Sequence, residues 1–374
     1  MIPVFRPSMD KREIDAVSKV LLSGWIGLGP KTKEFEDKFA DYIGVKYASA
    51  LTSATAALHL GLEALGVSGG EVITTPMTFV SSNHAIIYNH AIPVFCDIEP
   101  DTLNIDANKI EPLINKKTKA ILVVHYGGYP VDMGKILRIA HKHGLKVIED
   151  VAHGCGGEYK GRKLGSIGDI GCFSFHAVKN LATGDGGMVT TNNRNVYDRI
   201  TTMRWVGIKK DTWSRDLGNS KGYSWYYNVE DFGFKYHMND ITAAIGLVQL
   251  EKLDKANTRR SEISQMYTKA LSLIPQIQPP VIKPYMTKPA CHNYVIKYDG
   301  RDGLNAYLKE RGISTGVHYI PNNHYAIYKK FKGKTPITQE VWKKLITLPL
   351  YPDLTNSQVT LIIKEVTKYV SCNM

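Results

Sequence analysis

Cysteine is scarce in this chain of 374 residues, and the cysteines that do occur lie far apart. None belongs to a CxxC pair, which argues against a structural zinc site, and their odd number argues against a disulfide framework. Such usage is typical of the reducing cytosol, so we expect a cytoplasmic location. The histidines offer no third ligand at a metal-binding spacing, so we expect no metal site. The cysteines are Cys96, Cys155, Cys172, Cys291 and Cys372.

Long hydrophobic runs are also missing. Apolar runs such as residues 120–124 are far shorter than the ~20 residues that a membrane-spanning helix needs. The N-terminal sequence MIPVFRPS has no basic region followed by an apolar stretch, so the sequence predicts no signal peptide. We therefore expect no membrane partner.

Acidic residues are outnumbered, because 35 Asp and Glu stand against 47 Lys and Arg, a net charge of +12. This excess favours an anionic ligand. The basic residues are spread along the chain and form no stripe, so we expect a phosphorylated small molecule and no nucleic acid. With 43% hydrophobic and 22% charged residues, the composition is that of a soluble globular protein.

Up to residue 191 the chain alternates between short β-rich runs and helical patterns. This alternation is typical of βαβ crossovers and predicts an α/β fold, with a mainly parallel central sheet covered by helices on both faces. Two helical patterns come first; the second has Phe35, Phe39 and Tyr42 on one face, with Thr32 as its expected cap and Gly44 as its end. The expected strands are 47–51, 72–75, 93–97, 120–125, 145–151, 171–175 and 187–191.

The pattern changes after Asn239. A long helix is expected from Asp240 to about Leu273, and the proline-containing run 275–280 then resembles a linker. We divide the chain into a large domain, residues 1–250, and a small C-terminal α+β domain, residues 251–374. The small domain is expected to contain strands at 293–298 and 315–319 and helices at 303–311 and 357–370.

Two expected strand ends carry chemical groups. Asp150 ends the strand 145–151, and ligands of open parallel sheets lie at the carboxyl ends of strands. Lys179 lies between a further strand and the glycine-rich turn 184–187. Alone, Asp150 is better explained as a turn cap and Lys179 as an exposed loop lysine. Together they fit a Schiff-base enzyme, which needs a partly desolvated amine and a carboxylate facing the nitrogen of a pyridine ring.

A phosphate site is expected where the strand 47–51 runs into a helix. Ser53, Ala54 and Thr55 offer free backbone amides, hydroxyls and the positive end of a helix dipole. Alone, this segment is an ordinary helix N-cap. Combined with Asp150 and Lys179, in this order along the chain, it closely resembles the fold-type-I pyridoxal phosphate (PLP) enzymes.

Further motifs narrow this resemblance. Over nearly its whole length the chain is similar to the DegT/StrS family of nucleotide-sugar aminotransferases. The resemblance implies the three-layer PLP-transferase fold of aspartate aminotransferase, with PLP bound in the large domain. The matching segments are SGWIGLGP (23–30), TFV (78–80), HYGG (125–128), EDVAH (149–153), SF with the lysine (174–179), TGVHY (315–319) and LPL (348–350).

The resemblance also implies a role for each matching residue. Lys179 is the lysine that attaches to PLP and moves the proton, and Asp150 is the partner of the ring nitrogen. His153 contacts the 3′ oxygen of the cofactor, and Phe79 stacks on its ring, although each alone is typical of a buried core. The phosphate site is expected to consist of Ser53, Ala54, Thr55 and Ser174.

The chain departs from the family pattern at a few positions. Lys235 stands where the family commonly has an Asn that reaches the cofactor phosphate of the neighbouring subunit. The resemblance therefore implies a homodimer with shared active sites, in which Lys235 either contributes a full charge or is merely exposed. His237 replaces an Arg, so one anion contact stays open. Ala54 and Asp185 replace a Gly and a Glu, with little consequence.

From the resemblance we expect an aminotransferase that moves the amino group of L-glutamate to a nucleotide-linked keto sugar. The expected acceptor is a 4-keto-6-deoxy hexose, and the product is an amino sugar for surface polysaccharide, such as lipopolysaccharide O-antigen, or for natural-product glycans. Trp25, His318 and Tyr319 are candidate sugar-nucleotide contacts. The nucleotide, the aminated carbon and the stereochemistry stay open.

Two alternatives remain. A sugar dehydratase of the same fold uses the amine form of the cofactor, but such enzymes replace the cofactor lysine, typically with His, and Lys179 opposes this. A non-enzymatic regulator on the same scaffold would use the positive charge for nucleic acid, and the pairing of Asp150 with Lys179 opposes that.

Overall fold

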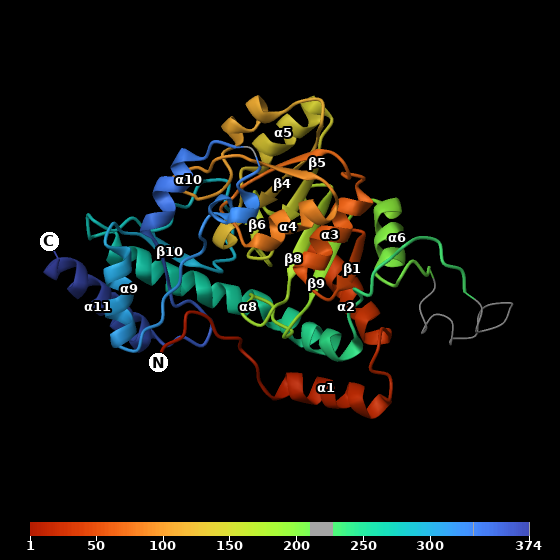
Figure 1. Cartoon of the computed structure of the whole chain (residues 1–374). Helices are drawn as coiled ribbons and strands as arrows, with labels where there is room; N and C mark the ends of the chain where they lie inside the picture. Colours follow the sequence, from red (N-terminus) through yellow and green to blue (C-terminus); the bar gives the residue numbers. More distant parts are fainter. Residues whose placement is uncertain (210–226, 332, 374) are drawn as a thin grey trace.

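A seven-stranded sheet lies at the centre of the computed structural model, which describes residues 1–209, 227–331 and 333–373 (Figure 1). Its strand order is β1-β9-β8-β5-β4-β2-β3. The five strands from β8 to β3 are parallel, and β9 is antiparallel to both β1 and β8. The expected, mainly parallel sheet is therefore confirmed. The strands are β1 (Tyr47–Leu51), β2 (Glu71–Thr74), β3 (Ile92–Phe95), β4 (Thr118–Val124), β5 (Lys146–Asp150), β8 (Ile170–Ser174) and β9 (Gly187–Thr191).

Helices cover both faces of this sheet. The side chains of β4 alternate between two cores, because successive residues of a strand point to opposite faces. Ile121 and Val123 pack with α2 and α5, whereas Leu122 and Val124 pack with α3 and α6. The result is the expected three-layer α/β arrangement. These helices are α2 (Pro30–Ile43), α3 (Ala54–Ala64), α4 (Val80–Tyr88), α5 (Met133–His143) and α6 (Arg194–Met203).

A smaller second sheet packs beside the C-terminal helices. Its antiparallel strands β10 (Tyr294–Lys297) and β11 (Leu345–Leu348) share a core with α9 (Arg301–Glu310), α11 (Asn356–Cys372) and the C-terminal half of α8 (Asp240–Leu271). The N-terminal half of α8 contacts α2 and α1 (Lys11–Ser23) (Figure 1). Helix α8 therefore spans both parts of the molecule, and a domain boundary after residue 250 stays a prediction. The remaining elements are the hairpin β6 (Glu158–Tyr159) and β7 (Arg162–Lys163), and α10 (Pro336–Val341).

Two expectations of local structure were wrong. Thr32 does not cap α2; Gly29 is the N-cap, and the carboxylate of Asp240 accepts the free amides of Lys31 and Thr32 at 3.0 and 2.9 Å. The segment 315–319 is not a strand, because β10 pairs with β11 instead and only Gly316 forms an isolated bridge. The end of α2 at Gly44, in the left-handed conformation with φ 79°, is confirmed.

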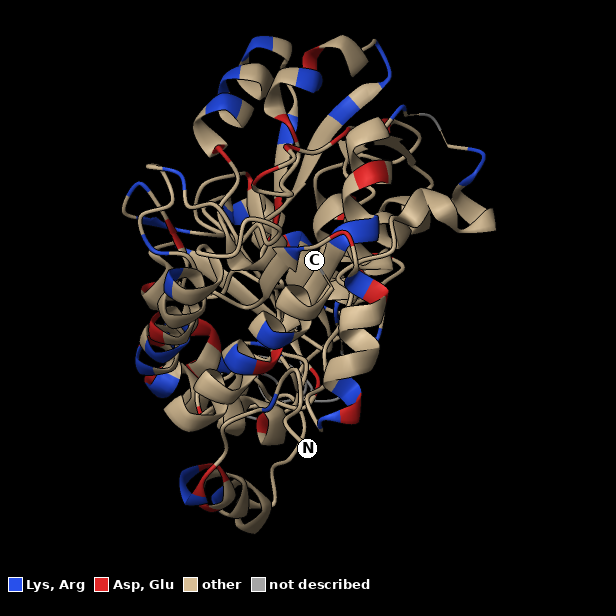
Figure 2. Ribbon diagram, turned by 90° about the vertical axis from the view of Figure 1, so that its left-hand side faces the viewer, with Lys and Arg blue, Asp and Glu red and all other residues tan. Residues whose placement is uncertain are grey.

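Basic and acidic residues are mixed over the molecule (Figure 2). Figure 2 shows Lys and Arg on helices and loops throughout the molecule, interspersed with Asp and Glu. None of the helices that the structure describes combines the length and the apolar character needed to cross a bilayer. Among the same residues, His, Cys, Asp and Glu form no cluster of three that suits a metal ion.

Candidate active site

A pocket of about 380 Å³ opens at the carboxyl ends of the central strands. Ligands of open α/β sheets bind at this edge. The structure brings most of the sequence-predicted site residues together around it. The pocket lining includes Ser53, Ala54, Thr55, Phe79, Asp150, His153, Ser174, Lys179, His318 and Tyr319.

Asp150 presents a buried carboxylate to this pocket from the end of β5. Its Oδ2 accepts a hydrogen bond from the Ser82 hydroxyl at 2.7 Å, and its Oδ1 accepts the Ala152 amide at 3.0 Å. Burial raises the pKa of Asp150, against the lowering effect of these donors and of Lys179. The structure places no cation of the described residues within ion-pair distance of Asp150, so a positively charged group in the pocket would stabilise its charged form.

Lys179 approaches the same pocket from the loop after β8. Its side chain is half-buried, and its amine makes no hydrogen bond or ion pair with the residues that the structure describes. Desolvation lowers the pKa of Lys179 to about 8, although the charge of Asp150 opposes this shift. An exposed lysine has a pKa near ~10.4, so Lys179 is much more often neutral, and therefore nucleophilic, at physiological pH.

His153 is neutral, and its hydrogen bonds define its tautomer. Its pKa lies well below the ordinary value because of burial and the nearby charges of Lys179 and His318. The Gly127 amide donates to Nδ1 at 3.3 Å, so the ring proton belongs on Nε2. That proton is donated to the Tyr319 hydroxyl, 3.0 Å away, which leaves the proton of Tyr319 free to be donated elsewhere.

His318 is fixed beside this pair. Its Nδ1 lies 2.8 Å from the Thr347 hydroxyl, and its carbonyl oxygen accepts a hydrogen bond from Tyr126. Burial, with the charge of Lys179, lowers the pKa of His318 to about 4. These contacts hold His318 at the pocket, which Tyr319 also lines.

The N-terminus of α3 forms the anion-binding side of the pocket. Ser53 is the N-cap, and its hydroxyl oxygen accepts the Ala56 amide at 3.1 Å, while Thr55 donates to the Ser81 hydroxyl at 2.8 Å. Strand β9 approaches closely here, because a Cβ at Gly187 would lie 2.3 Å from the carbonyl group of Ser53. Glycine at this position therefore lets the backbone hold the first turn of α3 in place.

Phe79 borders the pocket, whereas two other candidates lie away from it. The Phe79 ring is 57% exposed and lies 6.0 Å from the ring of Tyr319, so it forms a wall of the pocket and is not a core residue. Lys235 and Trp25 do not line this pocket. The Lys235 amine lies over the Trp205 ring, 3.3 Å from its centroid, and Trp25 donates to the Leu28 carbonyl at 3.0 Å.

Sequence reasoning missed the residues that support Asp150. Thr78 and Ser82 form a short chain, in which Thr78 donates to Ser82 at 2.8 Å and Ser82 donates to Asp150. Ser81 and His176 also line the pocket. A signal was available, since two serines directly follow the TFV motif, where the first turn of a helix leaves hydroxyls facing the strand ends.

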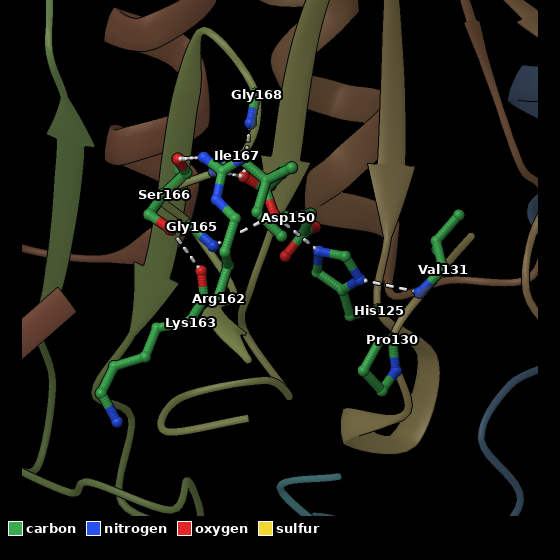
Figure 3. A network of polar contacts seen from close by, with 12 residues as sticks. His125, Pro130, Val131, Asp150, Arg162, Lys163, Gly165, Ser166, Ile167 and Gly168 are labelled. Atoms are coloured by element: carbon green, nitrogen blue, oxygen red, sulfur yellow. Dashed lines mark hydrogen bonds and ion pairs between the residues drawn. The ribbon is translucent and has the colours of Figure 1, made fainter. Parts of the chain in front are cut away.

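The residue before Asp150 is tied into a separate network on the opposite face of the sheet. Glu149 is fully buried and accepts hydrogen bonds from the amides of Gly165, Ile167 and Gly168 at 2.7–3.0 Å and from His125 at 3.1 Å. Figure 3 shows His125 between this network and the Val131 amide, which donates to its Nδ1 at 3.1 Å. These contacts lower the pKa of Glu149 despite burial and fix the end of β5.

This set of donors and acceptors fits three of the polar groups of pyridoxal phosphate. The buried Asp150 suits a protonated ring nitrogen, the Lys179 amine suits the aldehyde, and the first turn of α3 with its hydroxyls suits the phosphate. Phe79 offers an aromatic face for the ring between them.

Comparison with known proteins agrees with this chemistry. A model of the DegT/DnrJ/EryC1/StrS aminotransferase family matches residues 7–367. The spore coat polysaccharide biosynthesis protein SpsC of Bacillus subtilis is 42% identical, over 98% of this chain and 96% of that protein.

Solved structures are similar over the whole length. The aminotransferase TlmJ of Streptoalloteichus hindustanus superposes with a TM-score of 0.93 at 34% identity, covering 100% of both chains. The Spr1654 protein of Streptococcus pneumoniae in its PMP form also gives 0.93, at 32% identity and 100% coverage of both chains, and its PLP form gives 0.92.

Proposed function

Because the chain belongs to the DegT/DnrJ/EryC1/StrS aminotransferase family and is a PLP-dependent sugar aminotransferase, we propose that it transfers the amino group of L-glutamate to a nucleotide-linked keto sugar. The proposed acceptor is a 4-keto-6-deoxy hexose, which yields a 4-amino-4,6-dideoxy sugar nucleotide. The similarity to SpsC, a spore coat polysaccharide biosynthesis protein, supports a product destined for surface polysaccharide, of which O-antigen is one kind. The net charge of +12 suits a substrate that carries a diphosphate.

Bound PLP supplies an electron sink for the carbon from which a proton is removed. The amine of Lys179 is the group that would attach to the cofactor aldehyde, and once released it can take a proton from one carbon and return it to another. Its pKa of about 8 suits both steps, because a general base works best near the operating pH. Asp150 would keep the ring nitrogen protonated, with Ser82 and Ala152 holding its carboxylate in place.

The other pocket residues would bind and orient. Ser53, Thr55 and Ser174 would hold the phosphate at the first turn of α3. Tyr319, whose hydroxyl accepts from His153, would supply a hydrogen-bond donor toward the ring oxygen, while Phe79 packs on the ring face. His318 and Tyr319, which line the pocket, would contact the sugar nucleotide, and Trp25 remains a proposed contact of the nucleotide.

We also propose a homodimer that shares its active sites. The exposed Lys235 does not line the pocket of its own chain, so its charge is available to the cofactor phosphate of a partner. The segment 235–238 leads directly into α8. The cysteines are all unpaired, and four of them are buried, which supports a cytoplasmic location.

The observation that carries this proposal is the convergence of Lys179, Asp150 and the first turn of α3 on one pocket. We expect purified protein to be yellow, and borohydride should fix the cofactor to the peptide that contains Lys179. Supplied with glutamate, it should release 2-oxoglutarate and aminate one member of a panel of GDP-, dTDP- and UDP-linked 4-keto-6-deoxy sugars, detected by mass spectrometry. Lys179→Ala should abolish both reactions, whereas the exposed-loop variant Lys160→Ala should retain them. Labelling of another lysine would overturn the assignment.

A further inference from the structure

A second, smaller cavity of about 30 Å³ lies behind Lys179. It is enclosed by the N-terminal segment at Ser8, by helix α8 at Lys252 and Arg260, and by the loop at Lys179 and Asn180. Lys179 also lines the active-site pocket, so its side chain borders both spaces. The proposed aminotransferase chemistry assigns no role to this cavity.

Arg260 brings a poorly neutralised charge to this cavity. The residue is only 5% exposed, yet among the described residues its guanidinium makes one hydrogen bond, from Nη1 to the Asn257 Oδ1 at 3.3 Å. That oxygen already accepts a hydrogen bond from Asn180 at 2.9 Å. A guanidinium has five N–H donors. No Arg260 nitrogen is both fully inaccessible and without a hydrogen-bond partner. Its remaining donors are therefore reached from the cavity.

Protein carboxylates do not neutralise this charge. Among the described residues, none lies within ion-pair distance of Arg260, and Asp353 acts on it only from farther away. The neighbouring Lys252 differs, because it pairs with Asp10 at 2.8 Å and with Glu13 at 2.5 Å. Burial even lowers the pKa of Arg260 to about 10. A buried charge without a partner is costly, so the cavity favours an anion.

We propose that this cavity binds a single monatomic anion, with chloride as the physiological ligand. One water molecule needs about 10–15 Å³ of such space, so about 30 Å³ accommodates a halide ion but excludes the backbone of an amino acid or a sugar phosphate. Guanidinium donors suit it, since they form charge-assisted hydrogen bonds with anions.

The anion site is connected to the active site by hydrogen bonds. Asn257 accepts from both Arg260 and Asn180, and the Asn180 Oδ1 accepts from His292 at 2.9 Å. The centroids of the His292 and His153 rings lie 4.5 Å apart. An anion that fixes Arg260 would therefore also restrict the motion of His292, which packs against His153 in the active-site pocket.

Crystallography with bromide tests the site directly. Crystals of the PLP-loaded enzyme, grown without halide and soaked in sodium bromide, should show an anomalous peak within hydrogen-bond distance of the Arg260 guanidinium. A parallel soak in sodium gluconate should show none. A bromide-soaked crystal without a peak at Arg260 overturns the proposal, whatever the behaviour of variants.

Thermal unfolding tests the site in solution. At constant ionic strength, replacing gluconate by chloride at about ten times its Kd should raise the Tm by roughly 2 °C in a saturable manner. Arg260→Gln should lose this halide-dependent increment even if its Tm in gluconate changes. The control Arg194→Gln removes an exposed arginine that pairs with Asp198, and it should retain the increment. An increment that persists in Arg260→Gln would show that halide acts elsewhere and refute the site.

Discussion

Among single residues, Ser82 determines how Asp150 holds its charge. Its hydroxyl donates to the carboxylate at 2.7 Å, and without it burial would raise the pKa of Asp150 further. A hydrogen bond to a charged group contributes about 1.5–3 kcal/mol, so Ser82→Ala should weaken PLP binding by roughly tenfold to a hundredfold. Asp150 must be ionised to hold a protonated ring nitrogen, so the loss should be larger at pH 6 than at pH 8.

Spectrophotometric titration of the cofactor-free protein with PLP measures this loss. The matched control is Ser81→Ala, one position earlier on α4, whose hydroxyl accepts from Thr55 and does not contact Asp150. We expect that variant to bind PLP more weakly by a factor that does not grow at acid pH. Equal pH dependence in the two variants would contradict the role of Ser82.

Lys179 should show its lowered pKa in the rate of cofactor attachment. Only the neutral amine attacks an aldehyde, so in the cofactor-free protein the rate of borohydride-trappable attachment should rise with pH around a midpoint near 8. The charge of Asp150 raises the pKa of Lys179, so Asp150→Asn should move the midpoint lower. Stopped-flow absorbance provides the measurement. A midpoint near that of free lysine, about 10.4, would be inconsistent with a desolvated amine.

At this scale the sequence indicated the residues with distinctive chemistry. Lys179, Asp150 and the segment 53–55 were found because amines, carboxylates and helix starts fall at recognisable places on βαβ units. Arg260 was not found, since an arginine in a long helix has no local signature. Ser82 was missed because its position after the TFV motif indicates a hydroxyl near the strand ends but not the carboxylate that it faces. Their importance depends on which buried group they face, and that is set by packing.

Among the structural elements, strand β5 depends on Glu149 for its attachment. Glu149→Gln would turn one carboxylate oxygen into an amide donor that faces two N–H donors, so we expect the free energy of unfolding to fall by about 2–4 kcal/mol. The pKa of Glu149 is lowered in the folded protein, so its contribution is present above the unfolded pKa of about 4.3 and is lost as pH falls through the folded value.

Urea unfolding at several pH values measures this effect. The difference between the wild type and Glu149→Gln should be full near pH 7 and should shrink as the pH falls below about 4. Glu310→Gln, which changes an exposed carboxylate, should remain within about 0.5 kcal/mol of the wild type throughout. A difference that stays constant with pH would mean that the charge of Glu149 is not what holds the strand.

Element boundaries show where sequence reasoning succeeds. The strands β1 and β9 were predicted with their observed bounds, because a short run of β-forming residues can be recognised from the local sequence alone. The cap of α2 was assigned wrongly to Thr32, since the true acceptor, Asp240, is remote in the sequence. Likewise β11 went unpredicted, and the segment 315–319 was favoured in its place, because both are short apolar runs and only tertiary pairing distinguishes them.

For the whole molecule, the shared active site is tested by mixing two variants. Lys179→Ala and Lys235→Ala, combined in equal amounts under subunit exchange at limiting PLP, should recover roughly a quarter of the wild-type sites. A mixed dimer regains one complete site if Lys235 serves the partner chain. Steady-state turnover before and after exchange gives the result.

Two results would contradict the shared site. If Lys235 serves its own chain, mixing restores nothing beyond the sum of the parents. If Lys235 is only a surface residue stacked on Trp205, the Lys235→Ala protein alone binds PLP normally.

The N-terminal segment packs against residues near the small sheet that come much later in the chain, and this has a consequence for synthesis. The Ile2 amide donates to the Gly312 carbonyl at 2.7 Å, and the Leu350 amide donates to the Val4 carbonyl at 3.0 Å. At about 5–20 residues per second, a ribosome makes these partners on the order of 15–60 s after the N-terminal segment. Throughout that interval the segment from Ile2 to Val4 lacks these hydrogen-bond partners and is accessible to chaperones and proteases. The segment from Ile2 to Val4 is thus among the last parts of the described chain to pack.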